Sequence, residues 1–137
     1  WFSGWEGGVP NCRWEREIRS TLLAKLAINA VINPLTAIHR VTNGALLTAP
    51  LAEDTERLTR EVQALLRAGG ADQIAEALPA RVTEVCSQTA KNHSSMRVDV
   101  EQGRPTEIEA IAGWLLSEWV DEPPPSPFLR HLYQTIR

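Results

Sequence analysis

The stretch from Leu22 to Pro34 constrains the fold most, because nearly every position in it is apolar. A segment this long, rich in leucine and alanine, is typical of a buried α-helix. Polar residues interrupt it at intervals of four, at Lys25, Asn29 and Asn33. Residues four apart lie above one another on a helix, so these side chains form one narrow polar stripe. A lysine buried in an apolar helix is costly unless something compensates it, so the stripe needs an explanation. For Lys25 alone, the structural alternative is a side chain that extends from the helix edge into solvent.

The rest of the chain predicts further helices separated by breaks at glycine and proline. The first helix should begin near Cys12 and stop or kink at Pro34, since proline disfavours a helical residue before it. Apolar periodicity and capping residues predict later helices at these ranges: 34–40, 51–68, 78–91, 94 or 95 to about 102, 107–120 and 128–136. No run alternates as a strand does, so the predicted class is all-α, a multi-helix bundle.

Length and composition fit one globular domain. The chain has 137 residues, of which 43% are hydrophobic and 23% charged, enough for one core and too few for two ordinary domains. Residues 1–11 contain several glycines and a proline and are expected to be a linker, which leaves 12–137 as the helical domain. A formal charge of -3 without a basic cluster argues against nucleic acid as a partner, and no apolar run reaches the ~18 residues that span a membrane.

Metal and redox sites are not expected. Cys12 and Cys86 are the only cysteines, and without a visible export signal both are expected to be free structural thiols. The three histidines, at positions 39, 93 and 131, have no Cys or His companion at ligand spacing, which argues against a zinc site. No glycine-rich phosphate loop occurs, so the domain has no dinucleotide fold of its own. The chain begins without methionine, which suggests a piece of something longer.

A second group of polar residues lies between positions 92 and 107. Ser94 and Ser95 fall where a helix N-terminus offers free amides, a natural place for a carboxylate or a phosphate. Glu107 falls in the first turn of the following predicted helix. If this group faces the stripe, Glu107 could balance Lys25 while the serines hold an anionic ligand. Each residue also has a local explanation, because either serine could be an N-cap and Glu107 a partner of the helix dipole.

Two motifs contain these residues. The first is Lys25-Leu26-Ala27-Ile28-Asn29 followed by Asn33-Pro34-Leu35-Thr36-Ala37; the second is Asn92-His93-Ser94-Ser95-Met96 followed by Asp99 and Thr106-Glu107-Ile108-Glu109-Ala110-Ile111-Ala112-Gly113. In order and internal spacing they resemble the C-terminal domain of ketopantoate reductases (2-dehydropantoate 2-reductases), over about residues 12–137. The chain departs from the family at Leu23, where a tryptophan is common.

The resemblance implies a helical domain of the 6-phosphogluconate dehydrogenase C-terminal type. It implies the NADPH-dependent reduction of 2-dehydropantoate to pantoate, a step of pantothenate biosynthesis in the cytoplasm. In the family a Rossmann domain precedes this one and carries the nucleotide, and the substrate lies between the two. The chain alone is therefore expected to be inactive. The resemblance assigns these residues by position: catalytic Lys25; substrate-binding Asn29, Asn33, Asn43 and Ser95, the last through the substrate carboxylate; and Glu107 at the junction of substrate and cofactor.

The chemistry agrees with these assignments. Hydride transfer to a ketone leaves an alkoxide that needs a proton and a nearby positive charge, and a desolvated lysine donates a proton readily near neutral pH. Lys25 is therefore predicted to be the general acid. Two assignments have local alternatives, since Asn33 could end a helix before Pro34 and Asn43 begins an Asn-Gly turn.

Two other functions stay open. The chain could be a helical dimerisation or interaction module without chemistry, although such a module has no need for an aligned Lys-Asn-Asn stripe. It could also belong to a reductase of this family that acts on another 2-oxo acid. Without a partner domain, the face that bears Lys25 should expose apolar surface, which favours self-association as a homodimer.

Overall fold

The structure is a computed structural model that describes residues 12–136, with side chains from Arg19 onward except that of Ser95. These residues form helices and no strand, which confirms the all-α class. The elements are α1 (Cys12–His39), the short 3₁₀-helix η2 (Asn43–Leu47), α2 (Leu51–Ala68), α3 (Asp72–Gln88), α4 (Ser95–Glu101), the π-helical turn η3 (Glu109–Gly113), α5 (Trp114–Ser117) and α6 (Pro127–Ile136). The predicted linker, residues 1–11, lies outside the described residues.

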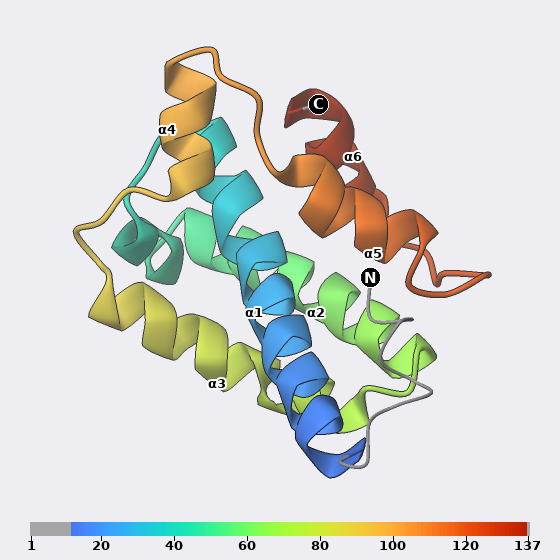
Figure 1. Ribbon diagram of the computed structural model, residues 1–137. Helices are drawn as coiled ribbons and strands as arrows, with labels where there is room; N and C mark the ends of the chain where they lie inside the picture. The colour runs from blue at the N-terminus through green and yellow to red at the C-terminus, as the bar shows by residue number, and fades with distance from the viewer. Residues whose placement is uncertain (1–11, 137) are drawn as a thin grey trace.

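The helix α1 is the centre of the bundle. It crosses the middle of Figure 1 and packs against α2, α3, α4 and α6. Its C-terminal half supplies much of the core, since Ala27, Val31 and Leu35 have no exposed surface. The N-terminal half differs, because Leu22 is 44% exposed. The stretch from Leu22 onward is therefore buried only in part, contrary to the prediction of burial on all sides.

The predicted stop or kink at Pro34 is not an end of α1, because the helix continues to His39. Pro34 has no N–H group to donate to the Ala30 carbonyl, which normally weakens a helix. Here the following turn is buried in the core, and the Thr36 hydroxyl lies 2.9 Å from the Ile32 carbonyl oxygen. Tertiary packing outweighs the local preference, and no separate helix at 34–40 forms.

The helix α3 begins six residues earlier than predicted and carries Pro79 in its interior. Pro79 cannot donate to the Ala75 carbonyl one turn back. A side chain of α2 replaces that bond, because Gln63 Nε2 donates to Ala75 O over 2.7 Å. The neighbouring helix thus satisfies the acceptor that proline leaves free, and Pro79 lies inside α3 and not in the first turn of a helix as predicted.

Other boundaries follow the sequence. The predicted helix over 51–68 is correct, with Gly69 at its C-terminal end, and the final helix is correct to within one residue. The segment predicted at 107–120 is shorter, because helical structure ends at Ser117. Beyond it, Trp119 Nε1 donates to the Leu65 carbonyl oxygen over 2.7 Å and its ring covers Gly69, which leaves no room for a Cβ atom there. This contact turns the chain away from the helix axis.

The charged face of α2 is solvated as predicted at the Glu56–Arg60 pair, whose side chains are 70% and 74% exposed. Glu61 is different. Its carboxylate accepts the backbone N–H of Phe128 over 3.1 Å and of Leu129 over 2.8 Å. Glu61 therefore caps the N-terminus of α6 and fixes this last helix against α2.

Candidate active site

The polar stripe of α1 runs from an exposed end to a buried end. Lys25 and Asn29 are exposed, whereas Asn33, one turn further, is 9% exposed. Eight residues of helix separate the ends of the stripe, about 12 Å at 1.5 Å per residue. The predicted burial of Lys25 is wrong for this chain, because its side chain is exposed at the edge of a cavity between α1 and α3. The lysine is consequently free to meet a ligand or another domain.

One turn beyond the buried end of the stripe, α1 meets the N-terminus of α4. Thr36 Oγ1 lies 2.7 Å from Ser94 Oγ, and both residues are buried. Ser94 is the N-cap of α4, since its hydroxyl oxygen accepts the backbone N–H of Arg97 over 3.1 Å. Ser95 is the first residue of α4, and its side chain lies outside the described part of the structure. The helix that carries the stripe therefore meets the second polar group through Thr36, which is not a stripe residue, and Ser94.

Asn43 lies in a buried connection between η2 and the segment that leads to α4. Its Nδ2 donates to Thr89 Oγ1 over 2.9 Å, and its backbone N–H donates to the Asn92 carbonyl over 3.0 Å. Gly44 N–H donates to the Ala90 carbonyl over 3.0 Å, at an approach where a Cβ would lie 2.7 Å from that of Ala90. Asn43 Oδ1 is buried without a hydrogen-bond partner among the described residues. Asn43 thus has a structural role, and one acceptor remains for a ligand or water.

Glu107 is exposed and immediately precedes the helical segment that begins at Ile108. Thr106 Oγ1 accepts the Ile108 N–H over 3.3 Å, as expected of a capping threonine. The Glu107 carbonyl accepts the N–H of Ile111 over 3.0 Å, while its carboxylate forms no ion pair with Lys25 within the described part of the chain. The predicted charge balance between these two residues is therefore absent from this domain alone.

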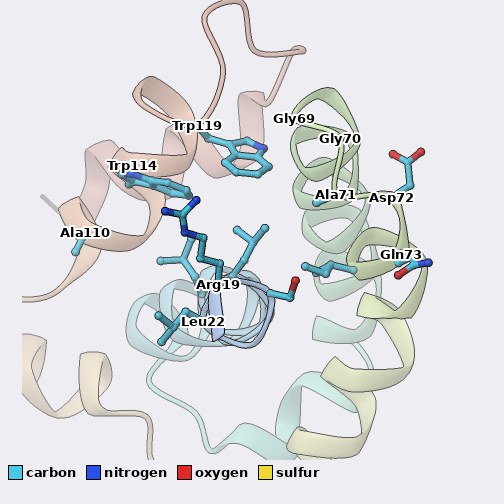
Figure 2. Close-up of a pocket in the computed structure, with 14 residues that line it drawn as sticks. Arg19, Leu22, Gly69, Gly70, Ala71, Asp72, Gln73, Ala110, Trp114 and Trp119 are labelled. Atoms are coloured by element: carbon cyan, nitrogen blue, oxygen red, sulfur yellow. The ribbon is translucent and has the colours of Figure 1, made fainter. Parts of the chain in front are cut away.

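The two best-formed cavities do not coincide with most of the predicted residues. The larger, about 880 Å³, lies between the start of α1, the turn from α2 to α3, and two tryptophans. Figure 2 shows Trp114 and Trp119 on one wall and Arg19 extending from α1 toward Trp114. Leu23 lines this cavity, but none of the six predicted site residues does. Its lining is mainly apolar and offers little for proton transfer.

The smaller cavity, about 300 Å³, is adjacent to Lys25. Its lining includes Lys25 and Ile28 of α1 and Gln73 and Arg81 of α3. Two cationic side chains border this space, so it favours an anionic group. Of the two cavities, we associate this one with the chemistry, because it contains a predicted catalytic residue despite its smaller volume.

The thiol and metal predictions concern groups away from this site. Cys86 is free and has no exposed surface, and burial raises the pKa of its thiol to about 11. It is therefore protonated at neutral pH and a poor nucleophile. The Cys12 side chain lies outside the described residues. From residue 12 to 136, wherever side chains are described, no three His, Cys, Asp or Glu residues are grouped to hold a metal ion.

By length and composition, Arg19–His39 could cross a membrane, which corrects the expectation that no segment of the chain could. More than half of this segment is buried within the domain, however. The core helix of a soluble protein passes the same test, so this apolar segment is weak evidence for a membrane span.

Comparison with known proteins places the chain in a family. The family described as "Ketopantoate reductase PanE/ApbA C terminal" matches residues 17–137. The chain belongs to the ketopantoate reductase family. The 2-dehydropantoate 2-reductase of Vibrio cholerae is 40% identical over 124 residues, which are 90% of this chain and 42% of that enzyme. The chain thus spans about two fifths of the length of the curated ketopantoate reductases it matches.

Solved structures agree with this assignment. The probable 2-dehydropantoate 2-reductase of Bacillus subtilis superposes with a TM-score of 0.72 at 41% identity, covering 84% of this chain and 38% of that one. A ketopantoate reductase family protein of Ralstonia eutropha gives a TM-score of 0.75 at 24% identity, covering 87% and 40%, and supports the fold alone. The all-α bundle is thus the fold of ketopantoate reductase C-terminal domains.

The sequence alone did not single out Thr36 and Thr89, which hydrogen-bond to residues of the candidate site. Both are buried or partly buried and hydrogen-bonded to predicted site segments. Thr36 is part of the first motif, so a signal existed. Its partner is 58 positions away in sequence, and only the tertiary structure brings the two together.

Proposed function

We propose that this chain is the substrate-binding and proton-donating half of an NADPH-dependent 2-dehydropantoate 2-reductase. The observation that carries the proposal is the polar stripe of α1, which begins at exposed Lys25 and ends at buried Asn33, one turn before Thr36 meets the N-terminus of α4. Membership of the family supports the reaction class. The reaction would serve pantothenate biosynthesis in the cytoplasm, and a homodimer belongs to the same proposal.

Each residue has a distinct role in this proposal. The Lys25 ammonium donates the proton that the substrate oxygen takes up as the ketone becomes an alcohol, and its charge stabilises the developing alkoxide. Asn29 and Asn33 orient the hydroxyl and carbonyl groups of the substrate without adding charge. Ser95, at the start of α4, binds the substrate carboxylate with help from the free amides of the first turn. Asn43 contributes through the unpaired acceptor at its Oδ1.

The residues of this chain could contact NADPH, but they do not form a site that would bind it alone. The described part contains no strand and no glycine-rich turn from strand to helix, so it has no cradle for a dinucleotide. Exposed Glu107 is available to contact a cofactor that a preceding Rossmann domain holds. NADPH supplies the hydride when bound there. The same domain would cover Lys25 and exclude water from it, which the isolated chain does not.

The test is the Lys25→Ala substitution in the complete reductase that contains this chain. Loss of the proton donor should lower kcat by about 10²–10⁴-fold with 2-dehydropantoate, measured as NADPH oxidation at 340 nm. Arg60→Ala, which removes a largely exposed cationic side chain from α2, is the control and should retain wild-type kcat. Wild-type turnover by the Lys25→Ala variant would refute the assignment of the general acid. Steady NADPH oxidation by the 137-residue chain alone would refute the need for the upstream domain.

A further inference from the structure

The Thr36 side chain forms a hydrogen bond between α1 and the N-cap of α4, in addition to the apolar packing of Met96 in the core. Its Oγ1 has three oxygen neighbours: the carbonyl oxygens of Ile32 at 2.9 Å and Asn33 at 3.1 Å, and Ser94 Oγ at 2.7 Å. A hydroxyl has one proton and two acceptor sites, so it can bond to a carbonyl of its own helix and to Ser94 together. Thr36 has no exposed surface, so water does not compete for these bonds.

The helix α4 depends on such links for its position. It has seven residues, too few for a stable helix without tertiary contacts. Its N-terminal end is fixed through Ser94, which bonds to Thr36 on one side and caps Arg97 N–H on the other. The preceding segment is held separately by the backbone bonds of Asn43 and Gly44. Thr36 bonds to Ser94, the residue immediately before Ser95.

The geometry points to Thr36 as a positioning residue that sets the distance between the polar stripe of α1 and Ser95 at the start of α4. Thr36 lies three residues from Asn33, on the adjoining face of the same helix, so one turn of α1 carries both a stripe residue and the link. The inference rests on the proposed function for its catalytic consequence. Its structural part, that Thr36 holds the end of α4, stands without that function.

The structural part is tested in this chain by amide hydrogen exchange. Thr36→Val removes the hydroxyl and keeps the shape, whereas Thr36→Ser keeps the hydroxyl. Thr59→Val is the matched control, because buried Thr59 also bonds to a carbonyl one turn back, at 2.7 Å, but its helix is α2. We expect the amides of α4 to exchange about tenfold faster in Thr36→Val, and near the wild-type rate in Thr36→Ser and Thr59→Val. Equal α4 exchange in Thr36→Val and the wild type would overturn the inference.

The catalytic part is tested in the complete reductase. If Ser95 binds the substrate carboxylate equally in the ground and transition states, its displacement raises KM and leaves kcat nearly unchanged. Thr36→Val should raise the KM for 2-dehydropantoate about tenfold, with the KM for NADPH unchanged and rescue by Thr36→Ser. An unchanged KM for 2-dehydropantoate in Thr36→Val, or an equal rise in Thr59→Val, would overturn the positioning role.

Two further outcomes separate a failure of the proposed function from a failure of the role inferred for Thr36. If the wild-type complete protein does not reduce 2-dehydropantoate, the proposed function fails, and the exchange of α4 still decides whether Thr36 holds that helix. If Thr36→Val does not fold, Thr36→Ala removes the same hydroxyl contact and leaves the Ser94 cap of Arg97 in place. It should then give the same faster exchange in α4 and the same selective rise in KM, and wild-type values for both would refute the link.

Discussion

Glu61 connects the last helix to the rest of the domain, and its removal gives a sharp test of the structure. The carboxylate accepts two backbone N–H groups, those of Phe128 and Leu129, at 3.1 and 2.8 Å. These donors belong to the first turn of α6, where no carbonyl of the helix itself can accept them. The substitution Glu61→Ala leaves both donors without this acceptor and removes a negative charge from the positive end of the helix dipole.

The magnitude follows from these two bonds. Loss of an N-terminal cap typically costs about 1–2 kcal/mol, and bonds to a charged acceptor lie at the upper end of such values. Glu61 is half-buried, so water replaces the lost acceptor only in part. We expect Glu61→Ala to lower the free energy of unfolding by about 2 kcal/mol. Glu61→Gln retains an acceptor oxygen without the charge and should cost about 1 kcal/mol.

Urea unfolding followed by circular dichroism measures this effect. With a slope of about 2 kcal/mol per molar urea, the Glu61→Ala midpoint should fall by about 1 M. Glu56→Ala on the same helix is the matched control, because its salt bridge with Arg60 spans 3.6 Å between largely exposed side chains and should matter little. If Glu61→Ala and Glu56→Ala have the same midpoint, Glu61 does not cap α6 and the reasoning is wrong.

Two further predictions concern packing and pH. Gly44→Ala would place a Cβ against Ala90, and backbone hydrogen bonds hold both sides of this contact. The substitution should therefore lower the free energy of unfolding, measured in urea, by about 1–3 kcal/mol. The control is Gly103→Ala, where no atom lies within 4 Å and only the positive φ of 69° opposes a side chain; an effect of Gly44→Ala no larger than that of the control would contradict the prediction. Burial raises the pKa of the Cys86 thiol from 9.0 to about 11, so the folded state favours the neutral thiol. Its contribution to the free energy of unfolding is complete below about pH 9 and should be lost as the pH rises toward 11. The loss is at most about 3 kcal/mol. The stability difference between wild type and Cys86→Ala should therefore shrink over that range, and a constant difference would contradict the prediction.

Local signals were sufficient where an element's ends depend on its own residues. The helix over Leu51–Ala68 follows from its apolar periodicity, from Pro50 before it and from Gly69 after it, and these features act within one or two turns. The same holds for Ser94, whose capping role follows from its place before α4. The two interior prolines were misjudged for the opposite reason. Pro34 lies in a buried turn, and the acceptor freed by Pro79 is satisfied by Gln63 of another helix.

For the site, the sequence by itself determined the family, the all-α class and the spacing of Lys25, Asn29 and Asn33, because periodicity and motif order are properties of the chain alone. The tertiary structure decided which of these residues are exposed, and that Thr36 meets Ser94 across 58 positions. Burial and long-range hydrogen bonds depend on which helix packs against which. No local pattern records that choice, and so Lys25 is exposed although its helix is the most apolar segment of the chain.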